Sequence, residues 1–124
     1  MLTSAPAIAF LPSTDLDRSR RFFADVLGLP VVELTAFALV LRAGPTMVRV
    51  TKVDDLRVQP FTVFGWQVSD IDGAVADLTG RGVTFLRYDG LAQDGHGVWA
   101  TPGGDRVAWF TDPDGNTLSL TEFR

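Results

Sequence analysis

The chain begins with alternating apolar and polar segments that predict a strand, a helix and three further strands. The apolar run Ala7–Leu11 predicts the first strand. Apolar residues from Leu16 to Leu27 then recur at near-helical spacing, and Gly28 marks the expected end of this helix. Three segments with strand composition follow, at Val31–Leu34, Phe37–Leu41 and Met47–Lys52.

The second half repeats this order of elements. Phe61–Val68 predicts a strand, and a helical stripe from Ile71 to Leu78 ends at Gly80 and Gly82. The later strands are expected at Thr84–Tyr88, Arg106–Thr111 and Thr117–Phe123, with the glycine-rich stretch Leu91–Asp105 as a long loop.

Two aspartates mark the same place in both halves. Asp15 and Asp70 each precede the apolar stripe of a helix, and both are expected to be helix N-caps. The segment Asp112–Asn116 has the composition of a tight turn between the last two strands. The chain therefore predicts an α+β fold of two βαβββ modules within one domain over residues 1–124. Module one spans 5–53, the connector 54–60 and module two 61–124.

Composition narrows the possible partners. The 124 residues are 46% hydrophobic, enough for a core, and the net charge of −4 opposes binding to nucleic acid and to anionic membranes. No targeting segment or membrane span is expected, and the absence of cysteine excludes disulfides and thiolate chemistry. We expect a cytoplasmic protein.

Three segments together resemble a known superfamily. They are STDLDRSRRFFADVLGL at Ser13–Leu29, VSDIDGAVADLTGRGV at Val68–Val83 and RVAWFTDPDGNTLSLTEF at Arg106–Phe123. In this combination and order they are similar to the vicinal oxygen chelate superfamily of glyoxalases, bleomycin-resistance proteins and extradiol dioxygenases. The resemblance implies two curved mixed sheets around a cleft. It also implies dimers, so a homodimer is expected.

In the metalloenzymes of that superfamily, four strand positions hold one divalent ion with His, Gln or Glu side chains. Carried over onto this sequence, the four positions are Ile8, Val48, Val63 and Ser119. Three are hydrocarbons and the fourth is a neutral hydroxyl, and none supplies the charged oxygen or imidazole nitrogen that such an ion requires. We therefore expect no metal and no cofactor.

No other pattern assigns a catalytic residue. The only histidine, His96, lies between two glycines in the long loop and is expected to be an exposed loop residue. Glu122, near the end of the last strand, is expected to face solvent. The aspartates have positions typical of helix caps, turns and the connector.

Strand alternation predicts which side chains line the cleft. If the last turn closes at Asp112–Asn116, Trp109 lies opposite Ser119, and Thr121 shares their face. Trp99 is either an anchor of a lid over the cleft or a strand residue packed on the sheet. The candidate ligand-binding residues are Ile8, Phe10, Val48, Val63, Gln67, Trp99, Trp109, Ser119 and Thr121.

Such a lining favours an aromatic or otherwise flat organic molecule. The leading hypothesis is therefore a metal-free small-molecule-binding protein. One alternative is a metal-dependent lyase, isomerase or dioxygenase with an unusual ligand set. Another is an interaction protein whose cleft is filled by its own side chains.

Overall fold

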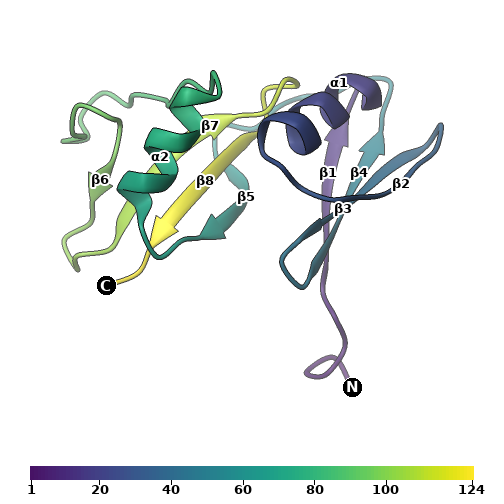
Figure 1. Cartoon of the computed structure of the whole chain (residues 1–124), viewed down its shortest axis with the longest axis horizontal. Coiled ribbons are helices and arrows are strands. Elements are labelled where there is room, and N and C mark those ends of the chain that lie inside the picture. Colours follow the sequence, from purple (N-terminus) through teal and green to yellow (C-terminus); the bar gives the residue numbers. More distant parts are fainter. The chain divides into compact units, whose positions relative to one another are not determined.

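A computed structural model describes residues Met1–Arg124, which form two compact units, Met1–Val58 and Gln59–Arg124. The boundary between them falls inside the expected connector 54–60. Each unit contains a four-stranded mixed sheet and one helical segment (Figure 1). This arrangement confirms the predicted α+β fold of two βαβββ modules. The grouping of both units into a single domain stays a prediction.

The first unit has strand order β1-β4-β3-β2. Its elements are β1 (Ile8–Ser13), α1 (Leu16–Arg20), the π-helix η1 (Arg21–Val26), β2 (Val31–Leu34), β3 (Ala38–Ala43) and β4 (Thr46–Lys52). β1 pairs in parallel with β4, and the other pairs are antiparallel. The core lies on the face towards α1, where Leu11, Leu39 and Val50 form one fully buried row across three strands.

The second unit has the equivalent order β5-β8-β7-β6. Its elements are β5 (Thr62–Gln67), α2 (Ile71–Gly80), β6 (Trp99–Ala100), β7 (Arg106–Thr111) and β8 (Thr117–Glu122). β5 pairs in parallel with β8, which also pairs with β7 in antiparallel register. α2 contacts β7 and β8, and its Ile71 and Val75 are buried with Phe110 and Leu118.

Both expected N-caps are confirmed. The carboxylate of Asp15 accepts a hydrogen bond from the backbone N–H of Arg18, and that of Asp70 accepts one from Gly73, each at 3.0 Å. Both carboxylates satisfy N–H groups that the first turn leaves without a partner. Neither α-helix is long and apolar enough to cross a membrane.

One predicted strand is wrong. Thr84–Tyr88 has no strand geometry, and the edge strand of the second sheet is β6, within the expected loop. Thr84–Tyr88 contributes one backbone hydrogen bond to β7, from Leu86 N–H to Trp109 C=O at 2.7 Å.

The side chain of Gln93 explains this difference. Its Oε1 accepts from the N–H of Tyr88 at 2.7 Å, and its Nε2 donates to the C=O of Leu86 at 2.9 Å and of Gly97 at 2.8 Å. These backbone groups would otherwise pair with a neighbouring strand. Gln93 thus joins the segment before the loop to the segment that enters β6.

An ion pair fixes the start of α2 to the last two strands. The guanidinium of Arg106 donates to both carboxylate oxygens of Asp72, at 2.9 and 2.7 Å. Glu122 lies 3.8 Å from the same guanidinium, and its Oε1 accepts from the N–H of Ile71 at 3.0 Å. Glu122 is therefore half-buried and bonded to the helix, and does not simply face solvent as the sequence led us to expect.

Replacement of Gln93 by alanine is expected to lower the free energy of unfolding by about 1–3 kcal/mol, because three backbone groups lose their partner. Thermal and urea unfolding measure this loss. The matched control is Gln67→Ala, which removes an exposed amide that makes no hydrogen bond in the structure. Equal stability of the two variants would contradict the role given to Gln93.

Replacement of Arg106 by glutamine is expected to remove a pH-dependent part of the stability. The hydrogen bond from Arg106 holds the pKa of Asp72 below its ordinary value. A carboxyl group with a lowered pKa stabilises the fold above its ordinary pKa of about 4, and this contribution is lost as pH falls through the lowered value.

The difference in Tm between wild type and Arg106→Gln should therefore be largest near neutral pH and shrink below about pH 4. Thermal unfolding at several pH values measures it. Arg42→Gln, at an exposed position on the other unit, serves as the control. A difference that is independent of pH would show that the ion pair is not its source.

Candidate functional site

The open face of the second sheet, opposite α2, carries the strongest candidate site. Its register forms two rows: Gly65, Ser119 and Trp109 lie side by side, and Gln67, Thr121 and Val107 form the next row. The expected pairing of Trp109 with Ser119 is thus confirmed, and Thr121 shares their face. We call these six residues, with Trp99 and Tyr88, the aromatic face.

Three aromatic rings meet on this face. Trp99 pairs with Val107 in the sheet, so it is a strand residue and not a lid anchor. Its ring stacks on Trp109 with centroids 6.2 Å apart, and Tyr88 meets Trp109 edge-on at 5.2 Å. Both indoles are half-buried and Tyr88 is 37% exposed, so part of the ring surface stays accessible.

Gln93 determines where two of these rings lie. It bonds the backbone of Tyr88 directly, and it bonds the C=O of Gly97, two residues before Trp99. The backbone of Gln93 also forms a bridge with Trp99. Asp94 supports the same loop by accepting from the N–H groups of His96 and Val98, at 2.8 and 3.0 Å.

Neither Tyr88 nor Gln93 was identified from the sequence. Tyr88 lay in a segment expected to be an ordinary strand. Gln93 lay in a loop with no periodic pattern, and its contacts run to backbone atoms several residues away. A glutamine within a glycine-rich loop is a weak signal by itself.

The corresponding face of the first sheet carries both apolar and basic side chains. Ile8 and Phe10 of β1 are 47% and 63% exposed, and their partners on β4 are Met47 and Arg49. Val48 is not on this face. It pairs with Ala9 and Leu41 and is fully buried towards α1.

Val48 was expected to lie beside Ile8, but the residue that pairs with Ile8 is Met47, one position earlier. The parallel register of β1 and β4 is fixed by long-range pairing that strand alternation alone does not reveal. Val63 lies at an irregularity of β5, where the pairing with β8 shifts between Thr62 and Phe64. Val63 is 40% exposed, but Gly65 is the residue that pairs with Ser119.

The donor set does not fit the metal ion that the resemblance implies. Ile8 and Val63 are hydrocarbons, Val48 faces the core, and the residue that replaces it in register is Met47. Ser119 offers one neutral hydroxyl. Neither unit contains a group of three or more His, Asp or Glu side chains arranged to hold a metal ion. No chemical step through a metal follows from these residues.

The charged groups of the second unit lie away from the aromatic face. Arg106, Glu122 and Asp72 are on the side of α2. His96 is exposed in the loop, as expected. Burial raises the pKa of Asp112, although Asn116 donates to it, and this carboxylate organises the last turn. None of these groups is placed on the strand face that carries Trp109.

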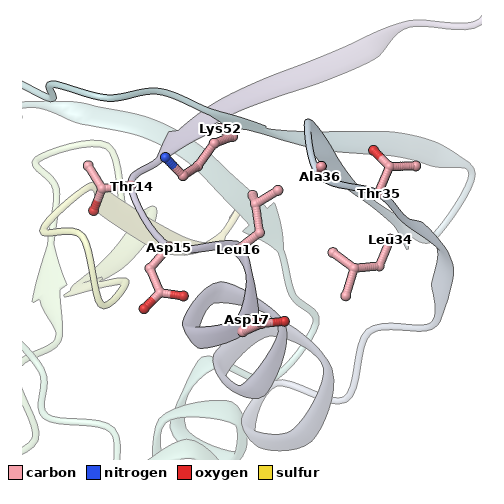
Figure 2. Close-up of a pocket in the computed structure, with 8 residues that line it drawn as sticks. All are labelled: Thr14, Asp15, Leu16, Asp17, Leu34, Thr35, Ala36 and Lys52. Carbon is pink, nitrogen blue, oxygen red and sulfur yellow. The ribbon is translucent and has the colours of Figure 1, made fainter.

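One open pocket of about 320 Å³ lies in the first unit, beside the first turn of α1 (Figure 2). It is lined by Thr14, Asp15, Leu16, Asp17, Leu34, Thr35, Ala36 and Lys52. Its polar groups have structural partners: Asp15 caps α1, and Lys52 lies 3.5 Å from Asp54. None of the candidate ligand-binding residues lines it.

Comparison with solved structures shows similar folds over nearly the whole chain. A glyoxalase/bleomycin resistance protein/dioxygenase superfamily member from Sphaerobacter thermophilus is 24% identical with a TM-score of 0.74, covering 99% of this chain and 100% of that one. The bleomycin resistance determinant encoded on transposon Tn5 is 22% identical with a TM-score of 0.75, at 96% and 98% coverage. Lactoylglutathione lyase from Agrobacterium tumefaciens is 20% identical with a TM-score of 0.70, at 96% and 93% coverage.

No curated protein matches the sequence. The family model of the glyoxalase/bleomycin resistance protein/dioxygenase superfamily matches residues 6–120, and the chain therefore belongs to this superfamily.

Proposed function

We propose that this protein binds a small, flat organic molecule on the aromatic face of the second unit, without using a metal ion. The observation that carries the proposal is the group formed by Trp109, Trp99 and Tyr88 beside neutral polar side chains. Aromatic walls with a few polar groups are typical of small-molecule sites. Flat rings gain both area burial and ring–ring contact on such a surface.

The exposure of the rings supports binding over a purely structural role. On the α2 side of the same strands, Phe110 and Leu118 are fully buried. The two indoles on the open face are only half-buried, and Tyr88 is exposed. A face filled by its own side chains would leave less aromatic surface accessible.

The similar structures are compatible with this proposal. One is named for bleomycin resistance and one for lactoylglutathione lyase activity, so the fold serves both a drug-resistance protein and an enzyme. The alternative of a metal-dependent lyase, isomerase or dioxygenase finds no suitable donor set in either unit.

Ile8 and Phe10 stay in the proposal as an apolar contact surface on the first unit, and Gln67 and Thr121 as polar contacts on the second. Val63 is retained as an exposed apolar contact. Val48 is removed, because its side chain belongs to the core. The cytoplasmic location stays a prediction.

Replacement of Trp109 by leucine should weaken binding of 4-nitroaniline, a neutral flat ring that quenches tryptophan emission, by about two- to tenfold. Equilibrium dialysis gives the affinity, and quenching of the wild-type protein gives an independent reading. Trp66→Leu is the matched control, since Trp66 stacks on Phe110 on the α2 side.

Two results would contradict the binding site. One is equal affinity of Trp109→Leu and wild type, and the other is an equal loss in both leucine variants. Circular dichroism should first show that each variant is folded.

We also propose that the chain forms a homodimer. Large apolar side chains are more than half exposed at several places, including Phe10, Val32, Phe37 and Phe61. Exposed apolar surface of this kind is often buried in an interface. Sedimentation equilibrium at micromolar concentration should give twice the chain mass. A single-chain mass throughout that range would overturn the dimer but not the binding site.

A further inference from the structure

The hydroxyl of Ser119 is an unusual group on the aromatic face. Ser119 is 9% exposed, and its side chain makes no hydrogen bond in the structure. It lies on β8, the strand that pairs with both β5 and β7. Its Oγ is not among the buried side-chain atoms that lack a partner, so the hydroxyl reaches the surface of this face. The hydroxyl is therefore available to a ligand on the aromatic face.

The hydroxyl of Ser119 has room on this face because residue 65 is a glycine and has no side chain. A Cβ atom at position 65 would lie 2.5 Å from Ser119 Oγ and 2.8 Å from the Ser119 carbonyl oxygen, closer than any real contact allows. The side chain of Ser119 therefore lies over the glycine, where any other residue would put a carbon atom. Trp109 lies on the other side of Ser119 in the same row. The result is a small notch, in which the hydroxyl of Ser119 lies between the backbone of Gly65 and the indole of Trp109.

From this notch we infer that the ligand carries an uncharged hydrogen-bonding group on its ring, which bonds Ser119 Oγ while the ring contacts Trp109. This inference rests on the proposed function and adds the class of ligand: a neutral phenol-like or carbonyl-bearing aromatic molecule. A serine hydroxyl both donates and accepts, so it suits either group.

The surroundings favour a neutral group. No residue of the two rows on the aromatic face is charged. Their polar side chains nearest to Ser119 are those of Gln67 and Thr121, which are neutral. A buried charge without an opposite charge or several hydrogen bonds is strongly unfavourable. A carboxylate or an ammonium group at the notch would therefore lose more hydration than one hydroxyl restores.

The experiment compares 2-naphthol with 2-methylnaphthalene, which has a similar shape but no hydrogen-bonding group. Affinities for both are measured by equilibrium dialysis with wild type, Ser119→Ala and Thr79→Val. Thr79 is an exposed hydroxyl residue on α2, on the other side of the sheet, so it is the matched control. Thermal unfolding of each variant confirms that it is folded.

Ser119→Ala is expected to weaken binding of 2-naphthol by about two- to tenfold and to leave binding of 2-methylnaphthalene unchanged. Thr79→Val should change the affinity for neither compound. Equal effects of Ser119→Ala on both compounds, or no effect on 2-naphthol, would overturn this inference while the proposed function stands. Failure of wild type to bind either compound would overturn both.

A separate experiment tests whether the notch prefers a neutral ligand to a charged one. 2-Naphthoate, which is ionised at neutral pH, should bind wild type more weakly than 2-naphthol does. Tighter binding of 2-naphthoate would overturn the neutral class of ligand, whatever the result with Ser119→Ala.

Discussion

The two-residue alternation of β8 is the constraint on which the second unit depends. This strand pairs on both sides, so its side chains have only two faces to occupy. Leu118 and Leu120 are buried on the side of α2, and this burial fixes the register because a shift of one residue would expose them. The same register then places Ser119 and Thr121 on the opposite face. The candidate site is therefore a consequence of how the core packs.

Much of this arrangement could be predicted from the sequence. The caps at Asp15 and Asp70 follow from local chemistry, since each carboxylate bonds an N–H three residues away. The pairing of Trp109 with Ser119 follows from a short turn, because a hairpin transmits its register directly to the next residues. Predictions of this kind depend on neighbours in sequence, and the structure confirms them.

The predictions that were wrong depend on contacts between distant segments. Val48 was assigned to the wrong face because a parallel pair has no turn to fix its register. The strand expected at Thr84–Tyr88 does not form, because the side chain of Gln93 takes its backbone hydrogen bonds. Side chain–backbone bonds across a loop leave no periodic trace in a sequence, so the position of Tyr88 could not be inferred in advance.

The four strand positions that the resemblance assigns to a metal ion, Ile8, Val48, Val63 and Ser119, also bear on the chemistry of this scaffold. A divalent ion needs several charged or strongly polar donors, and Ile8, Val48 and Val63 supply none. The neutral hydroxyl of Ser119 is a poor ligand for such an ion, but it can both donate and accept a hydrogen bond. Gly65 keeps the hydroxyl accessible, since a side chain there would collide with it. In the binding site that we propose, the shape of the aromatic face and this one polar atom are the source of selectivity.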